Sequence, residues 1–216
     1  MTLTIEITSD YICPWCYVAE DRLKQAIAQF TAEHPTPDIQ MVWHPFELNP
    51  NMPIPGIDRK TYRSNKFGSW AYSQQLDDQT MQATQGDNVE FRYDLMDITP
   101  NTFNAHRLTW FAAQQGQATT MAERILKAYF TEGRNIGDAD TLGQLASDIG
   151  LDQDAMNSFL RSNSGTQTIR ELERQAIAQG IRGVPHIRIG EQRLTGAQAP
   201  GAFLQALQNA IQAPAP

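Results

Sequence analysis

Two cysteines are the residues of this sequence best suited to chemistry. Cys13 and Cys16 are the only cysteines among 216 residues, and Pro14 and Trp15 stand between them. A thiolate that attacks a disulfide needs a second thiol within bonding reach to resolve the mixed disulfide, and this spacing supplies both. Two cysteines so close in sequence cannot cross-link distant parts of a domain. We therefore expect local redox chemistry at this tetrapeptide.

The same spacing also occurs in zinc sites, so zinc ligation is the competing interpretation. A closed structural zinc site needs four ligands, and the sequence has no second cysteine pair. The histidines that would have to complete such a site lack paired ligand spacing; they are His34, His44, His106 and His186. We therefore predict a redox centre and no metal site.

The residues around the cysteines predict a strand followed directly by a helix. Leu3, Ile5 and Ile7 alternate with polar residues, the pattern of a strand with two unlike faces. Pro14 suits the first position of a helix, where its missing N–H is no loss. Cys13 would then lie at the helix N-terminus, where free N–H groups and the helix dipole stabilise a thiolate and lower its pKa. Cys13 is thus the expected nucleophile and Cys16, one turn further, the resolving thiol.

The rest of the chain predicts an α/β framework interrupted by helices. A second strand is expected over 39–46, a hairpin turns at Gly190–Glu191, and a last helix begins at Pro200. Between them, a Pro- and Gly-rich connection leads into about a hundred residues with helical periodicity. We expect framework parts at 1–48 and 166–212, an all-helical insertion at 49–165, and a tail at 213–216.

Composition excludes several classes of protein. A net charge of −7 without a concentrated basic face argues against nucleic-acid binding. No apolar stretch is long enough to span a membrane. The segment before Arg22 carries no basic residue and lacks the apolar centre of a secretory signal, so we expect a cytoplasmic protein.

The segment from Asp10 to Tyr17 resembles the DsbA-like thioredoxin-fold proteins, in particular the FrnE-like branch of cytoplasmic dithiol oxidoreductases. Four further segments extend the resemblance over nearly the whole chain: 46–50, 104–108, 183–185 and 196–198. It implies a thioredoxin-like fold with an inserted helical domain. It also implies that Val184–Pro185 is a cis peptide that faces the cysteines and offers the Val184 backbone to a bound peptide or to glutathione.

The residues between the cysteines are expected to tune the thiol. Pro14 and Trp15 occupy these positions, and DsbA, a strongly acidic thiol protein, has a histidine where this chain has Trp15. Because Trp15 cannot become a cation, we expect Cys13 to be less acidic than the corresponding thiol of DsbA. Trp15 and Tyr17 either form an apolar contact surface for substrate or cover the start of the helix.

Four other residues carry two interpretations each. Asn49 and His106 lie in family-like segments and are candidates for substrate or glutathione contact, with local structural roles as the alternative. His186 either biases Cys13 electrostatically or is a hydrogen-bonded strand residue. Asp10 could perturb the thiol, although we expect an ordinary acidic turn residue there.

The expected function is exchange of disulfides with protein or peptide thiols, without a bound cofactor and with glutathione as a candidate co-substrate. The direction of exchange and a homodimeric state are left open. The first alternative is a glutathione-dependent isomerase of the 2-hydroxychromene-2-carboxylate type. Resemblance to that group implies a shared fold, but the group typically has serine at the position of Cys13 and lacks the second cysteine, so the presence of both cysteines argues against this alternative. The second alternative is a non-catalytic chaperone or metal-binding module.

Overall fold

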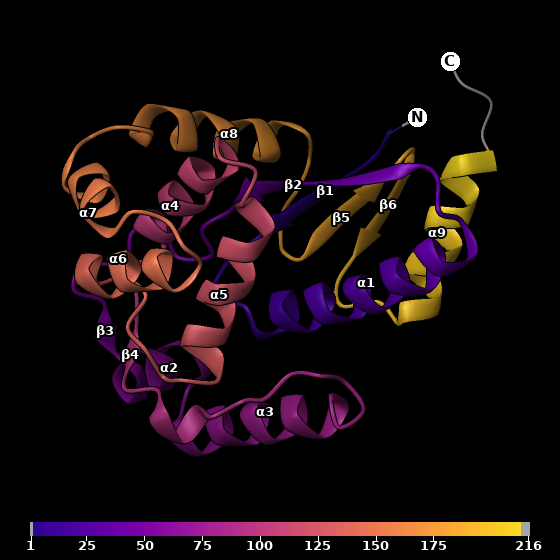
Figure 1. The fold of residues 1–216 in the computed structure, drawn as a ribbon. Helices are drawn as coiled ribbons and strands as arrows, with labels where there is room; N and C mark the ends of the chain where they lie inside the picture. Colours follow the sequence, from indigo (N-terminus) through magenta and orange to yellow (C-terminus); the bar gives the residue numbers. More distant parts are fainter. Residues whose placement is uncertain (1, 213–216) are drawn as a thin grey trace.

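A four-stranded sheet with helices on both sides forms the framework of the molecule (Figure 1). The structure, a computed structural model, describes residues 2–212. The strand order is β2–β1–β5–β6, with β2 parallel to β1 and the other neighbours antiparallel. The strands are β1 (Thr2–Ser9), β2 (Asp38–Pro45), β5 (His186–Ile189) and β6 (Gln192–Thr195).

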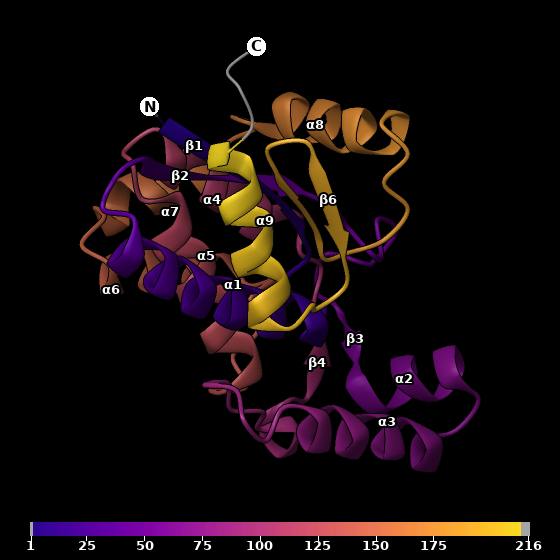
Figure 2. The same cartoon turned by 90° about the vertical axis from the view of Figure 1, so that its right-hand side faces the viewer.

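Two helices cover one face of this sheet. α1 (Pro14–Glu33) and α9 (Pro200–Gln212) lie side by side, as Figure 2 shows. The apolar residues of β1 point into the core between the sheet and these helices, which confirms the predicted alternation. α8 (Thr166–Ala178) runs over β2 on the other side. The core of this layer includes Leu3, Ile5, Ile7, Leu23, Phe30, Phe203 and Leu207.

The insertion between β2 and α8 is mostly helical. α4 to α7 pack against one another around a second core, and α2 and α3 form a helical pair at the periphery (Figure 1). The helices are α2 (Arg59–Phe67), α3 (Trp70–Ala83), α4 (Phe103–Ala113), α5 (Ala118–Phe130), α6 (Ala139–Asp148) and α7 (Gln153–Arg161), with a 3-10 turn at Tyr93–Leu95.

The expectation that the insertion is all-helical is wrong in one detail. β3 (Ile57–Asp58) and β4 (Ile98–Thr99) form a short antiparallel pair at the base of α2. Strands of two residues are too short to show alternation, so the sequence pattern could not reveal them.

The framework and the insertion share a packed boundary. Tyr11, Tyr17 and Val18, which belong to the framework by sequence, are part of the insertion's core. The start of α1 is therefore held from both sides. The predicted domain limits stay a prediction, and the predicted tail at 213–216 lies outside the described residues.

Over residues 2–212, none of the helices combines the length and the apolar character required to cross a membrane.

Candidate active site

The start of α1 positions the two thiols. Cys13 is the residue that precedes the helix, and Pro14 is its first helical residue, as predicted. The extended backbone of Cys13 turns into the helix through a hydrogen bond from the Cys16 N–H to the Cys13 carbonyl, 3.0 Å long. Both cysteines are free thiols, and their exposed fractions are only 6% and 3%.

The two thiols have opposite acid–base properties. The hydrogen bond from the Cys16 thiol is the largest cause that lowers the pKa of Cys13, and the backbone N–H groups of Cys16 and Trp15 act in the same direction. Burial raises the pKa of Cys16 well above its ordinary value, and the neighbouring Cys13 raises it further. Of the two, Cys13 is therefore the thiol that ionises first, which is the property of an attacking nucleophile.

A cis peptide lies beside Cys13. Val184–Pro185 is cis, as the resemblance implied, and the Cys13 Sγ lies 3.7 Å from the Val184 carbonyl oxygen. The Gly196 N–H donates to the Pro185 carbonyl at 2.9 Å and so fixes this loop against the end of β6. The segments 183–185 and 196–198 are thereby brought together beside Cys13.

A cavity of about 360 Å³ opens beside Cys13. Trp15, which is 38% exposed, stands at its wall, and α2 and α3 of the insertion form the opposite side. Its wall includes three basic residues and a single carboxylate. The lining side chains that bear on the argument are Cys13, Pro14, Trp15, Leu48, Arg59, Tyr62, Arg63, Lys66, Phe67, Asp77 and Tyr93.

Basic side chains outnumber acidic side chains on the wall of this cavity. Arg59 and Arg63 each lie 2.7 Å from a carboxylate oxygen of the same residue, Asp77. One carboxylate thus forms ion pairs with two guanidinium groups. The Lys66 ammonium donates a hydrogen bond to the Tyr62 hydroxyl at 3.0 Å. The wall therefore carries an excess of positive charge although the whole chain is acidic. Sequence reasoning missed these residues, and the spacing of the three basic residues on one face of α2 was the available signal.

Asp10 begins the expected turn, because its carbonyl accepts a hydrogen bond from the Cys13 N–H at 3.1 Å, but its side chain is more than an ordinary acidic turn residue. It is fully buried, its Oδ2 accepts a hydrogen bond from the Leu48 N–H at 2.7 Å, and its Oδ1 lies 3.4 Å from His106 Nε2. The negative charge of Asp10 opposes the lowering of the Cys13 pKa. His106 is also buried, its ring centre lies 4.9 Å from that of Tyr11 at a tilt of 40°, and it does not line the cavity.

Trp15 and Tyr17, which had the same two candidate roles, lie in different environments. Trp15 stands at the cavity wall, whereas Tyr17 is buried and stacks on Phe130 at 5.6 Å between ring centres. Asn49 borders the cavity through Tyr62, whose hydroxyl donates to its Oδ1 at 2.6 Å.

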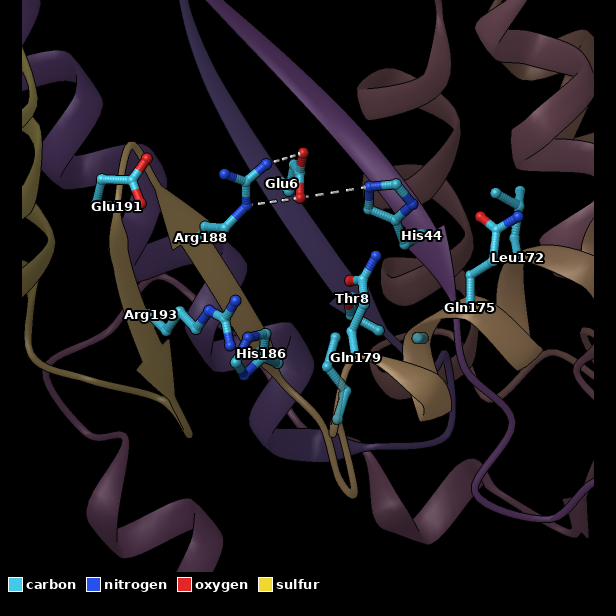
Figure 3. A pocket seen from close by; sticks show the side chains of 12 residues that line it. Glu6, Thr8, His44, Leu172, Gln175, Gln179, His186, Arg188, Glu191 and Arg193 are labelled. Atoms are coloured by element: carbon cyan, nitrogen blue, oxygen red, sulfur yellow. Dashed lines mark hydrogen bonds and ion pairs between the residues drawn. The ribbon is translucent and has the colours of Figure 1, made fainter. Parts of the chain in front are cut away.

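His186 lies in a different place from the dithiol cavity. Its ring is 3.3 Å from the Thr195 hydroxyl and shares a polar cavity of about 520 Å³ on the sheet face with Arg193 and Arg188 (Figure 3). Burial and Arg193 lower the pKa of His186. His186 is not among the main groups that shift the pKa of Cys13. Of the two interpretations of His186, its position therefore favours the hydrogen-bonded strand residue.

Within the part of the chain that the structure describes, no three His, Cys, Asp or Glu side chains are grouped as metal ligands would be.

Comparisons with known proteins agree with a thioredoxin-like fold. The DSBA-like thioredoxin domain matches residues 4–208. The chain is 31% identical to the Bacillus subtilis protein YwbO, over 97% of this chain and 98% of that one. Over 103 residues, 46% of this chain and 50% of the relative, it is 27% identical to a 2-hydroxychromene-2-carboxylate isomerase of Pseudomonas putida.

Solved structures extend the same likeness. A probable DsbA oxidoreductase of Streptomyces coelicolor, SCO1869, superposes with a TM-score of 0.88 at 28% identity, over 99% of this chain and 92% of that one. The cytosolic disulfide reductase DsbM of Pseudomonas aeruginosa, solved with glutathione, has a TM-score of 0.68 at 20% identity, over 98% of this chain and 100% of that one, and so shares the fold. The domain match covers nearly the whole chain, and this protein therefore belongs to the DsbA-like thioredoxin-domain family.

Proposed function

We propose that this protein catalyses thiol–disulfide exchange, with Cys13 as the nucleophile and Cys16 as the resolving thiol. The observation that carries the proposal is the unequal environment of the two thiols. Cys13 stands at a helix N-terminus beside a cavity, with hydrogen-bond donors that favour its thiolate, whereas Cys16 is enclosed and its thiol form is favoured. This is the arrangement that a dithiol exchange reaction needs.

The reaction follows from these positions. The Cys13 thiolate attacks one sulfur of a substrate disulfide, a mixed disulfide forms, and the other substrate sulfur leaves as a thiolate. The Cys16 thiol then loses its proton and attacks the Cys13 sulfur, which releases the second substrate thiolate and leaves the Cys13–Cys16 disulfide. Two electrons pass from the protein to the substrate, and the reverse sequence oxidises a dithiol. The backbone of Val184, beside the Cys13 sulfur, is placed to pair with a bound peptide.

The cavity supports an anionic thiol or disulfide as substrate. Glutathione carries two carboxylates and one ammonium group, so its net charge suits a wall with an excess of basic residues. Glutathione present in the DsbM structure agrees with this choice. We propose glutathione or an acidic peptide as the co-substrate, a cytoplasmic site of action and no bound cofactor. Trp15 and the Val184–Pro185 peptide would contact the substrate from the two sides of Cys13.

The test is the equilibrium of the dithiol with glutathione buffers of stepped composition. Alkylation of free thiols and mass spectrometry would report the fraction of protein with a Cys13–Cys16 disulfide. We expect a single two-electron transition in the wild type and none in Cys13→Ser or Cys16→Ser. A wild-type pair that never changes state in any buffer, or a variant that cycles as the wild type does, contradicts the proposal.

A glutathione-dependent isomerase is the second candidate, because a curated isomerase of this kind matches part of the chain. The cavity of about 360 Å³ beside Cys13 and Trp15 has room for an aromatic carboxylate. The Cys13→Ser variant separates the two functions. Disulfide exchange is lost in that variant under the first proposal, whereas isomerisation of 2-hydroxychromene-2-carboxylate would persist under the second.

A further inference from the structure

A polar cavity of about 520 Å³ lies on the sheet face opposite α1 and α9, and the proposed exchange reaction does not use it. Strands β1, β2, β5 and β6 contribute its floor, and α8 with the residues that follow it contributes a wall. It shares no lining residue with the cavity beside Cys13. Sites for small molecules have volumes of about 300 to 1000 Å³, so this cavity is large enough to hold one.

The floor consists of two neighbouring rows of side chains that cross the sheet. In the first row, the strand register places Glu6 opposite Arg188 and Arg188 opposite Arg193. Residues paired across strands project from the same face of a sheet, as do residues two apart along one strand. The second row therefore lies beside the first on the same face. Its members are His44, Thr8 and His186.

Arg188 and Arg193 are like charges placed directly opposite each other, which is unfavourable in a sheet. Glu6 compensates Arg188, because its carboxylate accepts hydrogen bonds from two nitrogens of that guanidinium, one of them at 2.9 Å. None of the ion pairs found over residues 2–212 includes Arg193. The charge of Arg193 is therefore available to an anion from outside the protein.

The two ends of the cavity differ in charge. Glu191 also belongs to the lining, but Figure 3 shows its carboxylate at the hairpin turn, apart from the Arg193 guanidinium, which lies beside the His186 ring. Burial and the charge of Arg193 lower the pKa of His186, so the ring is neutral at pH 7 and keeps one N–H donor. Gln179 and His44 lie across the cavity from Arg193 (Figure 3). A free cation with a donor beside it thus faces uncharged polar groups.

We propose that this cavity binds a small phosphate ester, with the phosphate group on Arg193 and His186 and a hydroxyl-bearing body directed toward Gln179 and His44. A guanidinium group binds two phosphate oxygens through two parallel hydrogen bonds, and a further oxygen of the tetrahedral phosphate accepts from the imidazole. A carboxylate has only two oxygens, both of which the guanidinium would occupy. The cavity is larger than a phosphate ion, which leaves room for the body of the ligand. The site goes beyond the proposed exchange function and does not depend on it.

Protection of the sheet edge is the competing explanation for Arg193. β6 is an edge strand, and charged side chains on such strands prevent pairing with other chains. A glutamate at position 193 would give the same protection and would pair with Arg188 across the strands. Edge protection alone therefore does not account for an arginine opposite another arginine.

The histidine rings allow a test that reports the location of binding. Of the four histidines, His44 and His186 line this cavity, whereas His34 and His106 do not and serve as internal controls. Carbon–proton NMR spectra of the histidine rings, assigned with single histidine-to-glutamine variants, would be recorded at about pH 7.5 and constant ionic strength. The added probes are inorganic phosphate, acetate, ribose and ribose 5-phosphate.

The same titrations would be made with Arg193→Gln and with the control Arg161→Gln. Arg161 lies on α7 in the insertion, and its side chain is 72% exposed, so both variants remove one exposed positive charge. The control therefore separates loss of a phosphate partner from a general change in net charge.

We expect phosphate to shift the ring signals of His44 and His186 with saturation and to leave those of His34 and His106 in place. Ribose 5-phosphate should bind at least about fivefold more tightly than phosphate, and ribose alone should cause no saturable shift. Arg193→Gln should weaken phosphate binding at least about fivefold, because it removes the charged donors, and Arg161→Gln should not.

Four outcomes would overturn the proposal. Shifts of all four rings without saturation would mean that phosphate acts only as a salt. Equal affinity for acetate would contradict a phosphate site, and ribose 5-phosphate that binds no more tightly than phosphate would contradict the place assigned to the ligand body. Unchanged phosphate binding in Arg193→Gln, together with lower solubility of that variant, would leave Arg193 with edge protection alone.

Discussion

Removal of the Cys16 thiol should make Cys13 a weaker nucleophile at neutral pH. The hydrogen bond from Cys16 is the largest cause of the low pKa of Cys13, and it exceeds the effect of burial and of the backbone donors. A hydrogen bond to an ionised group contributes about 1.5 to 3 kcal/mol, so its loss in Cys16→Ala lowers the thiolate fraction roughly 10- to 100-fold. A more basic thiolate attacks faster, which recovers about half of this effect on a logarithmic scale. The net expectation at pH 7 is a rate roughly 3- to 10-fold lower.

Iodoacetamide alkylation of Cys13 against pH measures this effect. Cys16→Ala should show slower alkylation at pH 7, a titration displaced to higher pH and a faster plateau above it. Cys16→Ser retains a hydroxyl donor at the same position, so its profile should lie between Cys16→Ala and the wild type. Identical profiles for all three proteins would refute the assignment of Cys16 as the donor. A Cys13 as acidic as the thiol of DsbA would refute the separate expectation drawn from Trp15.

Three further predictions concern pH, the backbone and the cavity. Burial, and the nearby Glu123 carboxylate, raise the pKa of Glu20 to about 8. The contribution of Glu20 to the free energy of unfolding is therefore largest below pH 4.5 and is lost as the pH rises through about 8. Urea titrations at pH 5 and 9 should show this loss of stability, and Glu20→Gln should reduce the difference between the two pH values. Gly133 has a φ of +65°, and an added Cβ would lie 2.4 Å from the Leu95 carbonyl oxygen, so Gly133→Ala should cost more than about 2 kcal/mol. Gly116→Ala, with φ +71° and open space around the Cβ, should cost about 1 kcal/mol, and equal losses would contradict the packing described. Lys66→Ala should weaken binding of glutathione disulfide about two- to fivefold at low salt by calorimetry, whereas Lys60→Ala, on the same helix but outside the cavity wall, should not.

The sequence predicts the local part of the site well, because local patterns position it. The alternation of Leu3, Ile5 and Ile7 and the place of Pro14 were enough to put Cys13 at a helix start. The hairpin at Gly190 and the helix from Pro200 follow from equally local patterns. The cis state of Val184–Pro185 came from family resemblance, since nothing in the local sequence distinguishes it from the other X-Pro bonds.

The parts of the site that depend on distant contacts could not be predicted. Asp10 looks like a polar turn residue, and only the packing of α4 and the loop after β2 against it shows that it is fully buried. The charges of the cavity beside Cys13 depend on how α2 and α3 place two arginines around Asp77. Periodicity reports which face of a helix is apolar, but it does not report which segment that face meets.

The roles of the two cysteines can be tested most directly by trapping the mixed disulfide. Cys16→Ser and Cys13→Ser would each be incubated with glutathione disulfide, quenched with acid and mapped by mass spectrometry. The account predicts rapid glutathionylation of Cys13 in Cys16→Ser, and little or no reaction of the buried Cys16 in Cys13→Ser. Faster reaction at Cys16 than at Cys13, or no adduct on either, would contradict it.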